Sequence, residues 1–382
     1  MEWKEYSLGD ISKLKYGKNV SAKLCKGPVP IFSGYRKIGT CNTINCKKNT
    51  VIVIARGAGG CGDVKLTKED CFLTNLSISV ELDKGICNAK WFYYNHLLNN
   101  LSFLNSGSAQ PQITIDSLSK YLIRIPPIII QRKIAGILSA LDSKIENNNK
   151  INANLESQAQ ALFKSWFVDF TPFKDQPFVD SELGPIPQGW KVGKADDFYK
   201  INIGKTPPRK EKEWFSKNES DNKWISISDM GNCGLFISNS AEKLTNAAIK
   251  KFNISLVPVN TILLSFKLTI GRVAISDCDL TTNEAIARFI LPDECYLEFS
   301  FLMLKLYNYS TLGSTSSIAT AVNSKIIKSM KMVMPSLKVL EDFHTITNPL
   351  FEKIRFTQKE NQRLAALRDT LLPKLMSGEI KL

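Results

Sequence analysis

Two patterns of hydrophobic and polar positions alternate along this chain of 382 residues. The first consists of short β-branched runs, such as VIVIA (51–55) and TILLSF (261–266), which Gly, Asn, Asp and Pro separate. Runs of this kind predict strands joined by loops. The second is a long segment after a proline break, IRIPP (123–127) in one place and MVMPS (332–336) in the other. Its apolar residues recur at steps of four and three, which predicts a long helix in each place.

The two long segments have the average spacing of a coiled-coil seam, about 3.5 residues. Asn152 and Asn361 occupy equivalent polar positions in the middle of the two seams. A polar residue at such a position lowers stability but sets register and partner orientation. We therefore predict that the two helices pair with each other; the alternative is that each packs as an amphipathic helix on its own domain. The seams run through Ile134, Leu138, Leu141, Ile145, Asn148, Asn152, Leu155, Ala159, Leu162 and Trp166, and through Phe343, Thr347, Leu350, Ile354, Thr357, Asn361, Leu364, Arg368, Leu371 and Leu375.

Each helix has the length of a spacer, because a helix of about 36 residues spans about 55 Å. Pro349 and Pro373 fall inside the second long segment, where they would permit a kink or a break.

The chain also repeats itself. The matches, first copy before second, are Trp3-Lys4 with Trp190-Lys191, Gly17-Lys18 with Gly204-Lys205, Gly62 with Gly271, Pro126 with Pro335, and Leu162 with Leu371. The offset grows after the second match, which implies insertions in the second copy. The polar stretch TPPRKEKEWFSKNESDN (206–222) is the obvious place. The protein is therefore composed of two divergent halves.

These patterns together predict an α+β fold. Two pseudo-twofold-related, mixed α/β globular domains are separated by two long helices that form an antiparallel coiled coil. The predicted divisions are a first globular domain at 1–127, a central helical region at 128–170, a second globular domain at 171–335 and a C-terminal helical region at 336–382.

The formal net charge is +14, and most of the excess lies in the two globular segments. A basic surface on particular domains is expected of a protein that binds a polyanion such as nucleic acid. No apolar run approaches the roughly 18 residues that span a bilayer, and the N-terminus MEWKEYSLGD lacks the apolar region of a signal peptide. We expect a cytoplasmic protein.

Cysteine and histidine are too scattered to indicate a metal site. None of the nine cysteines forms a CxxC pair, and the chain has two histidines, His96 and His344. A zinc site needs Cys and His at short spacing, which leaves Cys41 and Cys46 as a weak exception. We expect reduced, buried thiols and no metal.

Motifs of catalytic sites are also missing. The double prolines at 126–127 and 207–208 do not fit the Asn/Asp-Pro-Pro-aromatic stretch of an adenine methyltransferase. Residues 204–206 end like a phosphate-binding loop, but Tyr199 stands where the first glycine is needed. No Ser/His/Asp grouping supports a hydrolase. We expect no active site in this chain.

One stretch, VIVIARGAGGCGDVKL (51–66), has the GxGxxG order of a dinucleotide-binding loop. The three glycines that give this order are Gly57, Gly59 and Gly62. Such a loop needs a helix after its glycines, whereas the residues that follow indicate turn and strand. The matching stretch TILLSFKLTIGRVAI (261–275) keeps only Gly271. We therefore predict a strand–loop–strand element, with Gly62 and Gly271 in turns.

Three stretches resemble the specificity (S) subunits of type I restriction-modification systems. They are QPQITIDSLSKYLIRIPPIIIQRKIAGILSALDSKIENNNKINANLESQAQALFKSWF (110–167), ELGPIPQGWK (182–191) and LRDTLLPKLMSGEIKL (367–382). The stretch at 182–191 is similar to the entry to another recognition domain, and the stretch at 367–382 is similar to the family's C-terminal signature. The chain departs from the pattern in two places. Leu340 stands in the second copy where the first has Gln131, the residue that opens the first helix. The segment STSSIATAVNS (314–324) matches the first copy only loosely.

The resemblance implies a DNA-recognition subunit that is not an enzyme. Each globular target recognition domain would read one half of a bipartite double-stranded DNA target. The helices would set the spacing and dock two modification (methyltransferase) subunits, and restriction subunits would join through the complex. S-adenosylmethionine, ATP and Mg would belong to these partners, with no cofactor in this chain. The alternatives are a stand-alone nucleic-acid enzyme and a scaffold that binds DNA without sequence preference.

Base readout uses polar side chains in loops, and phosphate contacts position the protein. We expect lysines to contact phosphate more often than bases, and for each candidate the alternative is a solvated surface charge. The DNA-binding candidates are Lys18, Arg36, Lys37, Arg56 and Lys65 in the first domain, and Lys205, Arg209, Lys210, Lys267 and Arg272 in the second.

Apolar residues cluster at the ends of both long segments, as in interface hot spots. The partner-binding candidates are Leu162, Phe163, Trp166 and Phe167 in the first, and Leu371, Leu372, Pro373, Leu375 and Met376 in the second. The alternative is that they complete the core where each helix meets the opposite globular domain.

Overall fold

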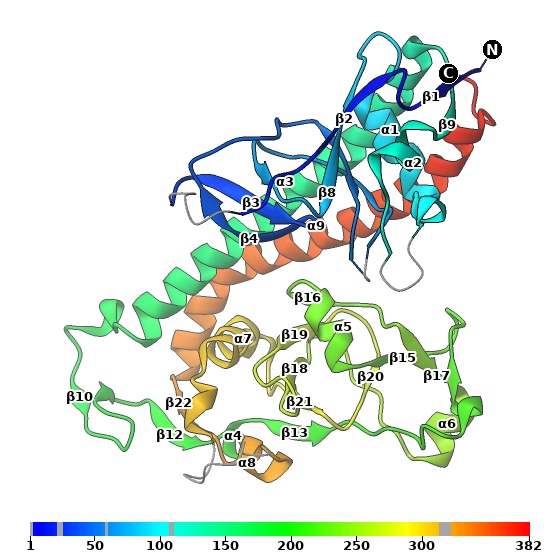
Figure 1. The fold of residues 1–382 in the computed structure, drawn as a ribbon. Helices are drawn as coiled ribbons and strands as arrows, with labels where there is room; N and C mark the ends of the chain where they lie inside the picture. Colours follow the sequence, from blue (N-terminus) through cyan, green and yellow to red (C-terminus); the bar gives the residue numbers. More distant parts are fainter. Residues whose placement is uncertain (1–2, 21–25, 58–59, 107–110, 313–321) are drawn as a thin grey trace. The chain divides into compact units, whose positions relative to one another are not determined.

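The computed structural model (Figure 1) describes residues 3–20, 26–57, 60–106, 111–312 and 322–382. The chain forms two compact units. Unit 1 contains Met1–Glu146 together with Gln362–Leu382, and unit 2 contains Asn147–Asn361. The division cuts both long helices, so each unit consists of one globular domain and one part of each helix.

The largest sheet of unit 1 is antiparallel and has the order β2-β8-β5-β6. All four residues of its central strand β5 are buried, which is why this strand is an uninterrupted apolar run, VIVI. A second sheet has the order β4-β3-β7, and β1 pairs with β9. The strands are β1 (Lys4–Ser7), β2 (Ser12–Tyr16), β3 (Val29–Ser33), β4 (Arg36–Cys41), β5 (Val51–Ile54), β6 (Val64–Leu66), β7 (Phe72–Leu73), β8 (Ser77–Leu82) and β9 (Leu122–Ile125).

Unit 2 has a five-stranded sheet of order β13-β21-β18-β19-β16, a four-stranded sheet of order β14-β17-β15-β20, and the pairs β12-β22 and β10-β11. The strands are β10 (Phe178–Val179), β11 (Ile186–Pro187), β12 (Lys191–Lys194), β13 (Lys200–Ile203), β14 (Phe215–Ser216), β15 (Asn222–Ile225), β16 (Phe236–Ile237), β17 (Glu242–Leu244), β18 (Ile262–Ser265), β19 (Val273–Ser276), β20 (Thr281–Thr282), β21 (Ile286–Ile290) and β22 (Lys331–Met334).

The strand order confirms the repeat that the sequence predicts. The order β2-β8-β5-β6 of unit 1 returns in unit 2 as β13-β21-β18-β19, and β16 is added at the edge. The parallel pair β3–β7 likewise returns as β15–β20. The insertion at 206–222 contributes β14, which extends the smaller sheet.

Several of the short helices begin at residues whose side chains cap them. Asn88 and Asn323 each accept hydrogen bonds from two backbone N–H groups, of α1 and α8, and the Thr114 hydroxyl accepts one from α2. The short helices are α1 (Ala89–Leu98), α2 (Ile115–Ser119), α4 (Ala195–Phe198), α5 (Ile227–Asn232), α6 (Asn246–Lys251), α7 (Leu297–Leu306) and α8 (Ser324–Lys328), with 3-10 turns at Ser102–Leu104, Thr171–Phe173, Lys212–Trp214, Glu294–Tyr296 and Tyr309–Thr311.

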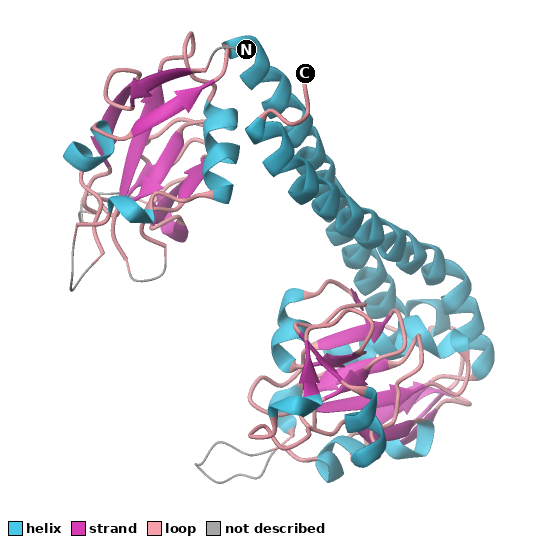
Figure 2. Ribbon diagram, turned by 90° about the vertical axis from the view of Figure 1, so that its right-hand side faces the viewer, coloured by secondary structure: helices cyan, strands magenta, loops and turns pink. Residues whose placement is uncertain are grey.

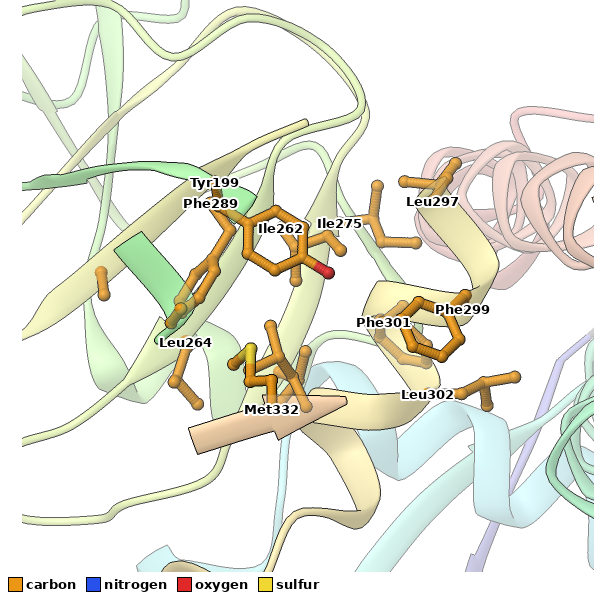
Figure 3. Packing of buried hydrophobic residues seen from close by; sticks show 14 of the residues in the cluster. Tyr199, Ile262, Leu264, Ile275, Phe289, Leu297, Phe299, Phe301, Leu302 and Met332 are labelled. Atoms are coloured by element: carbon orange, nitrogen blue, oxygen red, sulfur yellow. The ribbon is translucent and has the colours of Figure 1, made fainter. Parts of the chain in front are cut away.

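The core of unit 2 lies between its five-stranded sheet and helix α7. Figure 3 shows Phe299, Phe301 and Leu302 of α7 gathered with side chains of the strands, among them Ile262 and Phe289. In unit 1, α1 packs on β5 and β6 in the same way. Each sheet therefore buries one face against one helix of its own repeat.

The two long helices are α3 (Ile128–Phe167) and α9 (Leu337–Ser377). Helix α9 passes through Pro349 and Pro373 without a break. In unit 2 the ring of Phe167 lies 4.8 Å from that of Phe343, while Asn148 bonds to Asn361 at the other end. Rising numbers in α3 therefore meet falling numbers in α9, which confirms the antiparallel pairing, and within each unit the two helices lie side by side (Figures 1 and 2).

The centre of the seam in unit 2 is a polar layer formed by Asn148, Asn152, Thr357 and Asn361. The Asn148 amide donates to Asn361 Oδ1 at 2.9 Å, and the Thr357 hydroxyl donates to Asn152. Each contact is the repeat counterpart of the other, because Asn148 matches Thr357 and Asn152 matches Asn361. Asn152 and Asn361, predicted to set the register, each bond across the seam but to different residues.

We predict that Asn148→Ala destabilises the protein by about 1–3 kcal/mol, since it removes the hydrogen bonds that the buried Asn148 amide donates across the helix interface. Asn148 is fully buried and also donates to Glu360 at 2.6 Å. The double variant Asn148→Leu/Asn361→Leu should recover most of that loss, because an apolar pair replaces the polar one. Thermal unfolding followed by circular dichroism measures both changes.

The matched control is Asn147→Ala, on the exposed side of the same helix, which should change the free energy of unfolding by less than about 0.5 kcal/mol. Equal melting temperatures for Asn147→Ala and Asn148→Ala would contradict a stabilising role for the polar layer.

Candidate nucleic-acid interface

In unit 1, four loops meet where the sheets end, and we call them the first loop edge: residues 17–18, 33–36, 56–57 and 74–77. Their backbones are joined by hydrogen bonds from Gly17 N to Ser77 O at 3.0 Å and from Arg56 N to Leu76 O at 3.3 Å. The hydroxyl of Thr74 donates to Ser33 at 3.2 Å. The edge is therefore a connected surface.

The matching loops of unit 2 form the second loop edge: residues 204–206, 226–227, 266–272 and 283–285. Here the hydrogen bonds run from Gly204 N to Ile286 O at 3.2 Å, from Phe266 N to Ala285 O at 3.0 Å and from Asn283 N to Ile225 O at 3.0 Å. Both repeats thus build the same backbone scaffold, whereas the side chains on it differ.

At Gly17 in unit 1 and at Gly204 in unit 2, the backbone lies very close to the backbone of a neighbouring loop. A Cβ at Gly17 would lie 2.1 Å from Thr74 O, and one at Gly204 would lie 2.0 Å from Asn283 O. Backbone atoms at these distances cannot move aside as a flexible side chain could. The matching Gly-Lys pairs in the sequence therefore mark a position where the backbone allows no side chain.

The GxGxxG stretch forms a strand–loop–strand element, as predicted, because β6 and not a helix follows its last glycine. Gly62 and Gly271 lie in turns with φ of +95° and +86°, conformations that favour glycine. A Cβ at Gly62 would also lie 2.3 Å from Ser102 N. Gly57 has a φ of +126°, and Gly59 lies outside the described residues.

The first loop edge carries three of the predicted DNA-binding residues, Lys18, Arg36 and Arg56, and all three are exposed. Lys37 is also exposed and follows Arg36 on β4. Among the described residues none of these four has an ion-pair partner. Lys65 differs because it lies on β6, half-buried, with its amine 3.3 Å from Asp63.

In unit 2 the predicted residues are more constrained. Lys205 donates to the carbonyl oxygen of Asn253 at 3.0 Å, at the end of α6. Arg209 bonds to Glu242 at 2.8 Å and lies 4.5 Å above both Phe215 and Trp224. These two cations therefore stabilise the protein as well as carrying charge.

The other three candidates of unit 2 differ in exposure. Lys267 and Lys210 are exposed, and Lys267 lies in the loop between β18 and β19. Arg272 is half-buried and donates to Ile227 O at 2.6 Å. Lys205, Lys267 and Arg272 thus belong to the second loop edge, whereas Arg209 and Lys210 lie in the inserted segment.

Arg288 is a residue that the sequence analysis missed. It is 2% exposed, and the part of the chain that the structure describes offers it no carboxylate. Its guanidinium bonds to Thr282 Oγ1 at 2.9 Å and to Ser255 Oγ at 2.9 Å, and burial lowers its pKa to about 10. Because Thr282 O accepts from Lys205 N, Arg288 supports the second loop edge. An arginine inside the apolar strand IARFI was the available signal.

The predicted partner-binding residues lie mostly within the cores of the two units, and Pro373 is exposed. In α3, Leu162, Phe163, Trp166 and Phe167 pack in the core of unit 2. In α9, Leu371, Leu372, Leu375 and Met376 pack in the core of unit 1. The alternative interpretation, that each helix end completes the core of the opposite globular domain, describes this packing.

The described residues contain no group of three or more His, Cys, Asp or Glu side chains arranged to hold a metal ion. Cys41 and Cys46 are both buried free thiols. Within the same residues, no helix is both long enough and apolar enough to cross a membrane.

One family model matches most of the chain, and it does so twice. The model of the type I restriction modification DNA specificity domain matches residues 1–157 and again residues 187–366. The two matches correspond to the two repeats.

Individual proteins agree with this match. The HindI specificity subunit of Haemophilus influenzae is 27% identical over 99% of this chain and 100% of its own length. The MjaIX specificity subunit of Methanocaldococcus jannaschii is 31% identical over 87% of this chain and 78% of its own length. The crystal structure of a type I restriction-modification S subunit from M. genitalium has the same fold, with a TM-score of 0.64, 18% identity, and coverage of 98% of this chain and 96% of that one.

We predict that Gly17→Ala and Gly204→Ala each lower the free energy of unfolding by about 1–3 kcal/mol or more, because the new methyl group overlaps backbone oxygens. The matched control is Gly39→Ala, where no atom lies within 4 Å of the new Cβ. Urea titration measures the change. Equal midpoints for all three variants would mean that the scaffold tolerates a side chain at this point.

Proposed function

The chain belongs to the type I restriction modification DNA specificity family, and from this we propose that its two loop edges read the two halves of a bipartite DNA sequence. The observation that carries the proposal is the repeated backbone scaffold. Two surfaces with one backbone geometry and different side chains suit a target whose halves differ in sequence. No catalytic step is assigned to this chain.

On the first loop edge, Arg56 and Arg36 are the proposed base-contacting residues, since Arg binds guanine with two parallel hydrogen bonds. Lys18 is proposed to contact phosphate. On the second loop edge, Lys267 is exposed and its amine lies 5.9 Å from the centre of the Phe266 ring, while Lys205 and Arg272 are held by backbone carbonyls. We therefore assign Lys205 and Arg272 to phosphate contacts that fix orientation rather than sequence.

The long helices are proposed to set the spacing between the half-sites and to bind two methyltransferase subunits. Their outward apolar residues, rather than the buried helix ends, are available for this contact: Ile129 and Phe356 are 64% and 59% exposed. Methylation with S-adenosylmethionine would then belong to those partners, and cleavage with ATP and Mg to a restriction subunit. The functional division follows the predicted boundaries at residues 127, 170 and 335.

Exchanging residues 184–334 for those of a relative with a different target should change one half of the methylated motif and leave the other half and the gap unchanged. The segment holds the whole second loop edge and no strand of unit 1. The measurement is a genome-wide map of methylated adenine in cells that carry either chain with its methyltransferase subunits. A change in both halves would contradict independent reading, and a map without any bipartite motif would contradict the proposed function.

Lys18→Ala, Arg36→Ala and Arg56→Ala should each weaken binding of the assembled complex to its target. Each lost phosphate contact should reduce the magnitude of the negative slope of log affinity against log salt by about 0.9, and a lost base contact should relax the preference at one position of the first half. Equilibrium binding at several salt concentrations separates these effects. Lys120→Ala is the control, because Lys120 pairs with Asp116 at 2.9 Å outside the loop edge. A slope equal to that of the control would exclude the phosphate contact.

A further inference from the structure

The loop between β18 and β19 presents one leucine to solvent at its tip. Leu268 is 99% exposed, and Ile270, two residues on, is 37% exposed. Apolar side chains are normally withdrawn from water. Single exposed leucines are common on protein surfaces, but Leu268 keeps almost none of its surface covered and so contributes nothing to the core of the free protein.

The backbone at Leu268 is strained as well. Its φ is +59°, a region that a bulky L-residue rarely occupies. Thr269 N donates to Lys267 O at 2.6 Å, so Leu268 is the central residue of a three-residue turn with positive φ, which is a rare conformation. Strained residues of this kind concentrate at functional sites.

The surrounding loop holds this turn firmly. Ser265 Oγ donates to Thr269 O at 2.6 Å and accepts from Arg272 N at 3.0 Å. Gly271 N donates to Ser265 O at 3.0 Å. Ser265 thus closes the loop from inside, and the exposed leucine projects from an ordered support.

The first repeat has a glycine at the matching sequence position. When Gly62 is aligned with Gly271, RGAGGCGDV (56–64) matches SFKLTIGRV (265–273), and Gly59 matches Leu268. Glycine adopts positive φ without steric cost. The second repeat thus places a leucine where a glycine would satisfy the backbone, which indicates that the side chain itself is used.

The neighbours of Leu268 identify the kind of partner. Lys267 is adjacent and exposed, and Lys205 and Arg272 belong to the same second loop edge. An apolar tip next to an exposed lysine, on an edge that carries three cations and one exposed carboxylate, Glu284, fits a partner that is anionic outside and apolar inside. Stacked bases within a phosphate backbone have this character, and leucine is among the residues that enter base steps as wedges.

We propose that Leu268 is an apolar wedge that enters the DNA at one base step of the half-site read by unit 2, with Lys267 on the flanking phosphate. The inference rests on the proposed function of the second loop edge. Partial unstacking would favour flexible steps such as pyrimidine–purine. Leu268 would thereby contribute sequence preference without a hydrogen bond to any base.

The test uses the complex with its methyltransferase subunits and a duplex carrying the mapped target, with 2-aminopurine placed in turn at each position of the second half-site. Wild type should raise the fluorescence at one step. Leu268→Gly, which keeps the backbone conformation and removes only the side chain, should abolish that rise and weaken specific binding at least tenfold. Leu268→Phe should retain the rise.

Two controls separate the wedge from other effects. Leu256→Ala removes another exposed leucine of unit 2, at 51% exposure, and should leave binding and fluorescence unchanged. The melting temperature of Leu268→Gly should equal or exceed that of wild type, because glycine relieves the backbone strain. Affinity for a duplex without the target should stay within twofold.

Several outcomes would overturn the wedge. The first is that Leu268→Gly raises the fluorescence as wild type does. The second is that Leu268→Gly loses affinity although wild type raises the fluorescence at no position. The third is that Leu268→Gly assembles more weakly with the methyltransferase subunits when no DNA is present. The last would make Leu268 a protein contact. If wild type bound no bipartite target, the proposed function would fail together with the wedge; if it bound one and Leu268→Gly behaved as wild type, only the wedge would fail.

Discussion

Helix α3 starts in the core of unit 1, where Leu138 is buried, and ends in the core of unit 2, where Phe163 is buried; α9 runs from Phe343 in unit 2 to Leu372 and Leu375 in unit 1. Neither core is complete without the far end of the other repeat's helix. Each buried apolar side chain of this kind contributes about 1.5–3 kcal/mol. Each globular domain therefore packs on parts of both long helices within its own unit.

Between the two apolar ends of the seam lies the polar layer, whose predicted role is to set the register of the helices. The contacts of Asn148 with Asn361 and of Thr357 with Asn152 are repeat counterparts, so a slip of one helix would break both. The two repeats anchor the start of their long helices by different contacts. Gln131 is buried and bonds to Asn88 N, Ile86 O and Pro126 O. Its counterpart Leu340 is part of an apolar core, and a bond of 2.6 Å between His344 and the buried Glu298 anchors α9 instead, although burial raises the pKa of that carboxyl.

Much of this fold can be predicted from the sequence, because period and repetition are properties of the chain itself. The long helices follow from the spacing of apolar residues, and the turn at Gly62 follows from comparison with Gly271. The environment of single side chains cannot be predicted in this way. Trp166 and Leu375 have the same apolar character whether they bind a partner or fill a core. The cation of Arg209 is bound by Glu242 and two aromatic rings only because the inserted segment folds back on β15 and β17. The turn at Leu268 has no signal in composition at all, since its strain is visible only in the backbone.

In both loop edges the backbone scaffold is constrained, whereas the side chains that extend from it can vary. Gly17 and Gly204 are held against backbone oxygens and admit no side chain, so the scaffold is the same in both repeats. The side chains that extend from it, Arg56 in one repeat and Leu268 in the other, are free of that constraint because they contact little within the chain. A change at such a position alters what the edge can bind at small cost to folding. A protein built in this way can acquire a new half-site in one unit while the helix pair and the other unit stay as they are.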